Sequence, residues 1–154
     1  MSASPARSRS RSVARLAAVQ ALYQLEMEQT PLPKLLREFH QHRIDLPVDE
    51  QEEAEFAEAE RDFFDDVVTG VDARRAEIDA LIAAHLATDW KFERLDRLLK
   101  QILRAGCYEL LARADIPTAA VIDEYLDIAD AFYDAREKKF VNGLLDAAAK
   151  DVRQ

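Results

Sequence analysis

The sequence predicts an all-α protein, and three observations support this fold class. Glycine and proline are scarce, with three and five occurrences in 154 residues, whereas a β-sandwich or barrel needs special backbone angles at every corner. Alanine, leucine, glutamate and arginine dominate the composition, and all four are strong helix formers. Apolar residues make up 49% of the chain, so a chain of this length can bury a real core.

The first helix is predicted to begin at Ser10 or Ser12, because a serine at either position can cap the first backbone N–H groups. It ends before the segment Thr30-Pro31-Leu32-Pro33. A short second helix follows from about Pro33 to His42, since proline suits the first position of a helix. Residues 1–9 show no apolar periodicity, so we expect a flexible basic arm there.

A third helix is predicted in a densely acidic stretch, residues 49–66, which follows a loop at residues 44–48. Apolar residues repeat at helical spacing through the stretch and beyond Gly70, so the helix continues to about Leu86, with room for a bend. These apolar residues are Phe56, Phe63, Val67 and Val71.

Three further helices are predicted in the C-terminal half. Thr88-Asp89 caps a fourth helix from about Trp90 to Arg113. A proline break separates it from a fifth helix that begins at Pro117, and a turn precedes the last helix, residues 136–152. The expected architecture is a bundle of about six to seven helices. Two small bundles, divided near residue 88, pack as one domain over residues 10–154.

The predicted helical bundle lacks several residue patterns that are typical of catalytic and metal sites. None of the three histidines, His40, His42 and His85, follows a glutamate at the Glu-x-x-His spacing of a di-iron site. The single cysteine, Cys107, cannot build a zinc site of the usual kind, and no glycine-rich phosphate loop is present. We therefore predict a protein that is not an enzyme and holds no cofactor or metal, with residues 49–66 as a solvated helix face.

The sequence also favours a cytoplasmic protein with no membrane partner. No apolar run approaches the ~20 residues of a membrane span, and no charged-then-apolar leader opens the chain. A single cysteine excludes an internal disulfide, which fits a reducing compartment.

Charge is distributed unevenly along the chain, whose net charge is −9. Residues 1–25 contain no acidic residue, whereas the remainder carries 17 basic and 30 acidic residues. Such asymmetry indicates a nucleic-acid-binding arm, because guanidinium groups pair well with phosphate. A solubilising tail is the alternative. The basic residues of this arm are Arg7, Arg9, Arg11 and Arg15.

A second basic cluster opens the last helix, where the helix dipole disfavours positive charge. It consists of Arg136, Lys138 and Lys139. Either a bound anion offsets the unfavourable position, or the acidic neighbours Asp134 and Glu137 adjust this helix end.

The fourth helix carries another basic stripe, Arg97, Lys100 and Arg104, within about 60° of one another on the helical wheel. Its leucine and isoleucine residues form a separate apolar face. We therefore expect the basic stripe to be an ordinary solvated face.

One local conflict concerns residues 139–146. Their apolar spacing predicts a helix, whereas Asn142-Gly143 is a turn dipeptide. Glycine inside a helix costs roughly 1 kcal/mol relative to alanine, so a compensating contact is expected. Close contact with another helix at Gly143 is one explanation, and a partner that approaches the backbone is the other.

Four segments carry a family resemblance, and they occur in order over about residues 7 to 147. They are Ala14-Arg15-Leu16-Ala17-Ala18-Val19-Gln20-Ala21-Leu22-Tyr23-Gln24, Ile102-Leu103-Arg104-Ala105-Gly106-Cys107-Tyr108-Glu109-Leu110-Leu111, Asp115-Ile116-Pro117 and Lys139-Phe140-Val141-Asn142-Gly143-Leu144-Leu145-Asp146. Together with the arginine-rich arm, they resemble the NusB family of bacterial transcription antitermination factors.

The resemblance implies an all-helical protein that binds the boxA element of ribosomal RNA leader transcripts. It also implies joint action with NusE, which is a protein of the small ribosomal subunit. In the family this complex recruits other Nus factors to RNA polymerase, suppresses premature termination and supports ribosomal RNA synthesis.

The resemblance further implies an RNA-binding surface drawn from two parts of the chain. The first part is Arg7, Arg9, Arg11, Arg15, Gln20 and Tyr23, and the second is Arg136, Lys138, Lys139, Phe140 and Asn142. Tyr23 has two interpretations. It can stack on an RNA base, or it is a core tyrosine one turn from Val19, which its spacing favours slightly.

Two departures from the family pattern stand out. Asp123-Glu124-Tyr125 replaces a usual Asn-Glu-Ala, which leaves open the contacts with NusE, expected on the fourth to sixth helices. Arg136-Glu137-Lys138 replaces an acidic residue or a Ser-Pro pair, and the added charge should strengthen RNA binding.

Two other functions fit the same fold. One is a helical protein-binding adaptor, and the other is a stand-alone relative of the NusB-like domain of ribosomal RNA cytosine methyltransferases.

Overall fold

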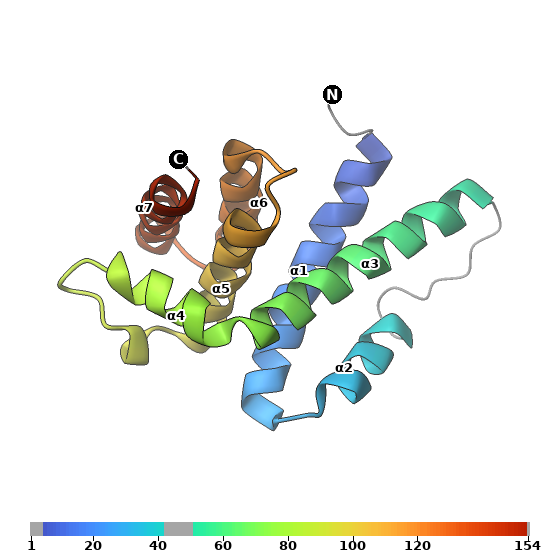
Figure 1. Ribbon diagram of the computed structural model, residues 1–154, viewed down its shortest axis with the longest axis horizontal. Coiled ribbons are helices and arrows are strands. Elements are labelled where there is room, and N and C mark those ends of the chain that lie inside the picture. The colour runs from blue at the N-terminus through green and yellow to red at the C-terminus, as the bar shows by residue number, and fades with distance from the viewer. Residues whose placement is uncertain (1–4, 42–50, 154) are drawn as a thin grey trace. The chain divides into compact units, whose positions relative to one another are not determined.

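The computed structural model describes the backbone of residues 5–41 and 51–153, and the side chains of residues 10–41, 58 and 60–153. Within these ranges the chain forms seven α-helices and a short 3₁₀ helix, without strands (Figure 1). The predicted all-α fold is confirmed. The chain divides into two compact units between Thr69 and Gly70.

The first unit contains α1 (Pro5–Glu28), α2 (Leu32–Phe39) and most of α3 (Gln51–Ala73). Helix α1 begins at Pro5, so the predicted start at Ser10 or Ser12 is wrong. Proline is pre-organised for a first turn, and no residue between it and Ser10 breaks a helix. Helix α1 ends where Gln29 adopts a left-handed conformation, with φ of 54°.

Alanine residues of α1 and apolar residues of α3 form the core of the first unit. All of the following residues are buried: Ala14, Ala17, Ala18, Ala21, Phe64, Val67 and Val68. Leu35 anchors α2 in this core. Phe39 stacks on Phe64 with ring centroids 5.5 Å apart.

The second unit contains α4 (Arg75–Ala84), the 3₁₀ helix η2 (Phe92–Arg94), α5 (Arg97–Ala112), α6 (Thr118–Phe132) and α7 (Ala135–Val152). Helix α5 is central, because α4, α6 and α7 all pack against it. Every residue from 101 to 110 is therefore buried. Since α4 packs on α5 and α7, the units divide at residue 69 and not near residue 88 as predicted.

The predicted start of the fourth helix at Trp90 is also wrong, because α5 begins at Arg97. Leu95 is extended, and Asp96 is the N-cap, whose carboxylate accepts a hydrogen bond from the N–H of Leu99 at 3.3 Å. The helix begins here because the Asp96 side chain satisfies a backbone N–H of the first turn. The sequence pattern predicts this capping role for residues 88–89 instead. Trp90 consequently lies in the connection between α4 and η2.

Arg104 corrects the prediction of a solvated basic stripe on this helix. Only 5% of its surface is exposed, and its guanidinium group donates to both carboxylate oxygens of Asp79 on α4, at 2.8 and 2.9 Å. Sequence spacing placed Arg104 away from the apolar face, but α4 covers that side of α5. Arg97 is exposed and Lys100 partly exposed.

Gly70 lies where α3 approaches α5. A Cβ atom at this position would stand 2.2 Å from Cε1 and Cζ of Tyr108, whose ring is buried. We expect Gly70→Ala to lower stability by about 1–3 kcal/mol, because displacing a packed ring costs more than the helix propensity gained. Thermal unfolding of the two proteins tests this. A raised midpoint for the variant would show that the Tyr108 ring moves aside without cost.

Cys107 is buried on α5, and burial raises the pKa of its thiol to about 12, with a smaller contribution from the negative charge of Asp79. The described part of the chain holds no cluster of three or more histidine, cysteine or acidic residues that could bind a metal ion. Among the described helices, none has the length and apolar character needed to cross a membrane.

Candidate RNA-binding surface

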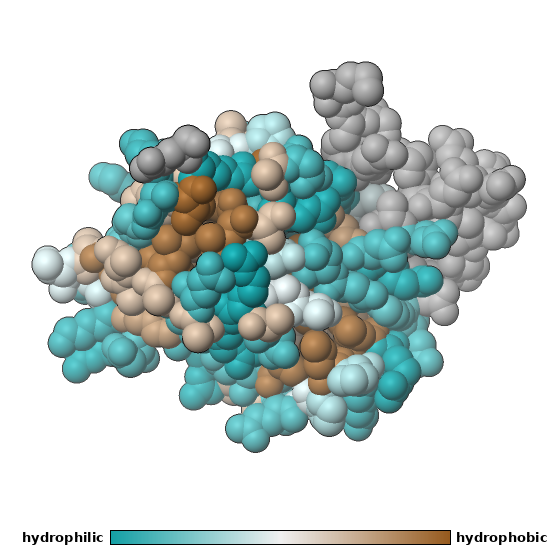
Figure 2. Space-filling model, viewed as in Figure 1, coloured by the Kyte–Doolittle hydropathy of each residue, from teal (hydrophilic) through white to brown (hydrophobic). Residues whose placement is uncertain are grey.

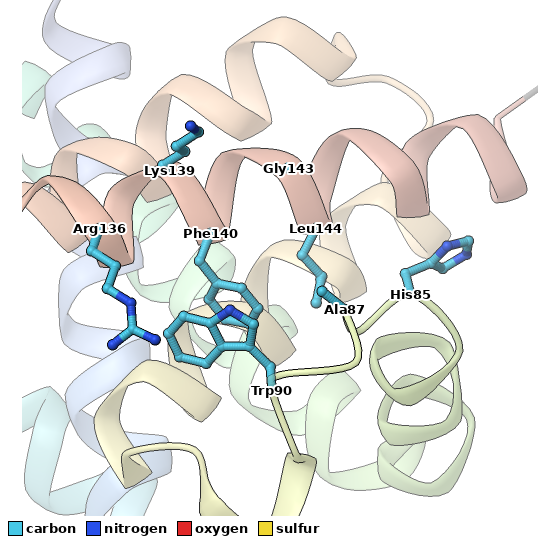
Figure 3. Close-up of a pocket in the computed structure, with 8 residues that line it drawn as sticks. All are labelled: His85, Ala87, Trp90, Arg136, Lys139, Phe140, Gly143 and Leu144. Carbon is cyan, nitrogen blue, oxygen red and sulfur yellow. The ribbon is translucent and has the colours of Figure 1, made fainter.

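A pocket of about 330 Å³ lies beside α7 in the second unit. One wall comes from α7 and the other from the segment that follows α4, as Figure 3 shows. The lining residues are Arg136, Lys139, Phe140, Gly143 and Leu144 of α7, with His85, Ala87 and Trp90 opposite. Residues 136, 140 and 143 lie about one turn apart along α7, so they present one face of this helix to the pocket.

Two aromatic rings stack across the pocket. The ring centroids of Trp90 and Phe140 are 4.1 Å apart, and the ring planes are inclined by 17°. The guanidinium carbon of Arg136 lies 4.6 Å from the centroid of the Trp90 ring, which is a cation–π contact. Lys139 extends outward from α7 (Figure 3). The pocket therefore combines flat apolar surface with positive charge.

The segment that carries Trp90 is held in place from two sides. Lys100 and Arg104 of α5 lie over the ring of Phe92, at 4.7 and 5.7 Å from its centroid. Tyr133, in the connection between α6 and α7, donates its hydroxyl hydrogen bond to the capping residue Asp96. Burial and this hydrogen bond raise the pKa of the Tyr133 hydroxyl, so it stays a donor at neutral pH.

The surroundings of Gly143 exclude one of the two explanations for the local conflict in the sequence. The glycine is helical and lies within α7, and a Cβ atom placed there would meet nothing within 4 Å. The explanation by close helix contact is therefore wrong. Gly143 lines the pocket, and the second explanation, a partner that approaches the helix backbone, stays a prediction.

The other residues predicted on α7 differ in their surroundings. Lys138 is partly exposed and pairs with Asp130 of α6, with 2.9 Å between Nζ and Oδ1. Asn142 is exposed next to Gly143. The structure thus brings Arg136, Lys139 and Phe140 together at one pocket and places Lys138 and Asn142 outside its lining.

The residues predicted on α1 lie in the first unit. Arg11 and Arg15 both place their guanidinium carbons over the ring of Phe63, at 5.1 and 4.9 Å from its centroid. Arg15 is only 4% exposed, so it packs against α3 in this structure. The backbone of Arg7 and Arg9 is helical, while their side chains lie outside the described residues.

Tyr23 is 38% exposed, so the interpretation as a core tyrosine is wrong. Gln20 is partly exposed on the same side of α1, three residues earlier.

On the face shown in Figure 2, polar side chains divide the apolar surface into separate areas. One area lies near α1 and α2 of the first unit, and another lies among α4, α6 and α7 of the second unit.

Trp90 is the residue of this surface that sequence reasoning missed. It is separated from Phe140 by fifty positions, and its predicted place at the start of a helix gave no reason to pair the two. The available signal was that it is the only tryptophan of the chain and follows a polar capping pair.

Comparison with known proteins identifies the family. The family model described as the NusB family matches residues 12–150. The chain belongs to the NusB family. A curated relative from Sphingopyxis alaskensis, a transcription antitermination protein NusB, is 62% identical over 148 residues, which cover 96% of this chain and 97% of the relative. The protein is therefore an antitermination factor of the NusB type, and this family is not one of enzymes.

Solved NusB structures share the fold. NusB of T. maritima is 32% identical, with a TM-score of 0.72, over 100% of this chain and 96% of that one. A second structure contains the antitermination factors NusB and NusE in complex with double-stranded RNA. The matching chain of that structure is 25% identical to this chain, with a TM-score of 0.73, over 93% of this chain and 98% of the matching chain.

Proposed function

We propose that this NusB protein binds boxA-type RNA of ribosomal RNA leaders together with NusE and thereby promotes ribosomal RNA transcription in the cytoplasm. The observation that carries the proposal is the exposed basic and aromatic surface at the start of α7, in a chain whose net charge is −9. Other Nus factors and RNA polymerase are indirect partners. The likeness to a NusB that was solved with NusE and RNA supports it.

The chemistry of this surface suits single-stranded RNA. Unpaired bases stack on aromatic side chains and on guanidinium planes, while cations neutralise the phosphates. Arg136 and Lys139 supply charge beside the rings of Trp90 and Phe140. Arg7, Arg9, Arg11, Gln20 and Tyr23 are proposed to add contacts from α1, with Arg15 as a packing residue of that helix. Lys138 and Asn142 are proposed to extend the surface along α7.

The proposal is tested by fluorescence anisotropy of a labelled boxA-type RNA and a scrambled control, with and without NusE, at two salt concentrations. We expect a preference for the boxA sequence that increases with NusE. Part of the affinity should fall with salt, because each neutralised phosphate releases counterions. Absence of RNA binding would favour the protein-binding adaptor. Binding that ignores sequence and NusE would show a generic basic surface.

Reversing the charge of Arg136 should weaken RNA binding about tenfold at fixed moderate salt, because Arg136→Asp replaces an attraction for phosphate by a repulsion. Lys150→Asp is the matched control, since Lys150 is an exposed cation of the same helix that does not line the pocket. Equal affinity of the Arg136 variant and the wild-type protein in the anisotropy titration would remove Arg136 from the surface.

A further inference from the structure

Trp90 is the single tryptophan of the chain, and neither antitermination nor the family resemblance assigns it a role. The fold leaves it partly exposed in the connection after α4, where its ring stacks on Phe140. The guanidinium group of Arg136 lies over the same indole ring, so the three side chains together present an aromatic and cationic surface to the pocket.

The pocket around Trp90 has the dimensions of a small-ligand site. Its volume of about 330 Å³ lies at the low end of the range of about 300–1000 Å³ for such sites. Trp90, Phe140 and Leu144 give it a flat apolar wall, while Arg136 and Lys139 line it with positive charge. An RNA duplex is too wide to enter, whereas one base and its phosphate are not.

Gly143 opens the α7 side of the pocket. With nothing within 4 Å of the missing Cβ position, a planar group can come close to the helix backbone between Phe140 and Leu144 (Figure 3). The open position leaves room for a bound group beside the one glycine of α7, although glycine weakens a helix.

We propose that this pocket receives one unpaired nucleobase of the bound RNA. The base packs against the Trp90–Phe140 pair, and its neighbouring phosphate lies near Arg136 and Lys139. This inference rests on the proposed RNA-binding function and adds a specific base-binding pocket to it. An acidic peptide would match the charge of the pocket but would make no use of its flat aromatic wall.

The lone tryptophan supplies a direct test. A single titration of the full-length protein with a single-stranded boxA-type RNA, labelled with a red dye, records RNA anisotropy and Trp90 emission together. We expect the emission to fall with the same midpoint as the anisotropy, because a base that packs against the Trp90–Phe140 pair changes the surroundings of the indole ring. RNAs with one abasic nucleotide at each position in turn should include one that binds without quenching.

The outcomes separate the inference from the proposed function. An anisotropy change without any change in Trp90 emission would overturn the pocket and leave RNA binding intact. No anisotropy change would overturn the proposed function and the pocket with it. Quenching by a glutamate-rich aromatic peptide, but not by RNA, would identify the pocket as a protein-binding site.

Two variants make the test independent of folding defects. Gly143→Leu fills the open position and adds a better helix former, so we expect unchanged or raised thermal stability with at least tenfold weaker RNA binding. Ala131→Leu is the matched control, because Ala131 is an exposed residue of α6 outside the pocket. Trp90→Leu keeps apolar bulk but removes the flat ring, and should cost about tenfold in affinity. Wild-type affinity for both pocket variants would refute the proposal.

Discussion

Replacing Arg153 by alanine should lower the free energy of unfolding by about 2–4 kcal/mol, although the residue follows the last turn of α7. Its guanidinium group donates five hydrogen bonds to the facing ends of α5 and α6. The acceptors are the backbone oxygens of Leu110 (2.9 Å), Ile116 (2.6 Å), Glu109 (3.0 Å) and Arg113 (2.7 Å), and Oγ1 of Thr118 (3.2 Å).

The reason for so large an effect is that the carbonyl groups where a helix ends lack the full set of helical N–H partners. Of the four carbonyl groups that Arg153 reaches, Glu109 also accepts from the N–H of Arg113, and Arg113 also accepts from the N–H of Ile116. A planar cation with five donors serves several of them at once. Removing it leaves partly buried acceptors with fewer partners, which costs more than the loss of an ordinary surface contact.

Urea unfolding followed by circular dichroism measures this effect, with the midpoint lowered and the slope unchanged. Arg153→Lys keeps the charge but not the fork of donors, so it should recover less than half of the loss. Lys150→Ala, at an exposed position one turn earlier, should change stability by less than about 0.5 kcal/mol. If the lysine variant matched the wild type, charge alone would explain the role of Arg153.

The second large effect is expected at Asp79. Asp79→Ala should destabilise the protein by about 2–3 kcal/mol, because it removes both carboxylate oxygens from the guanidinium group of Arg104. Breaking a fully buried pair costs about 3–5 kcal/mol. The lower figure applies here because the Asp79 side chain is 25% exposed and Gln101 Oε1 still accepts from Arg104 at 3.3 Å.

Chemical unfolding of a double variant separates the charge effect from simple packing. Asp79→Ala combined with Arg104→Met removes both charges and keeps apolar bulk, so it should be more stable than Asp79→Ala alone. A double variant as unstable as the sum of the two single variants would mean that Arg104 and Asp79 act independently.

Helices whose ends are marked by a proline or a turn in the sequence could be predicted. Pro117 and the turn before Ala135 define α6 and α7, and both helices lie where expected to within one or two residues. The start of α5 could not be placed, because residues 88–89 and Asp96 are all capable caps. In the structure Asp96 is the cap, and it also accepts a hydrogen bond from Tyr133, 37 positions away, which no local pattern predicts.

The candidate surface shows the same division. Arg136, Lys139 and Phe140 are neighbours in sequence, and their place on one helix was predictable from spacing. Trp90 joins them only through the packing of α4, η2 and α7 around α5, which no local pattern encodes. Arg104 misled for the same reason, since a helical wheel cannot show which side a later contact will cover.

The reactivity of Cys107 reports on the opening of the helical core in the second unit. Burial raises the pKa of this thiol to about 12, so the ionised form, which is the form that reacts, is scarce at pH 7. An alkylating reagent therefore reacts with Cys107 only after α5 separates from its neighbouring helices. The rate at which the native protein loses its only thiol measures how often the helical core opens, without any engineered label.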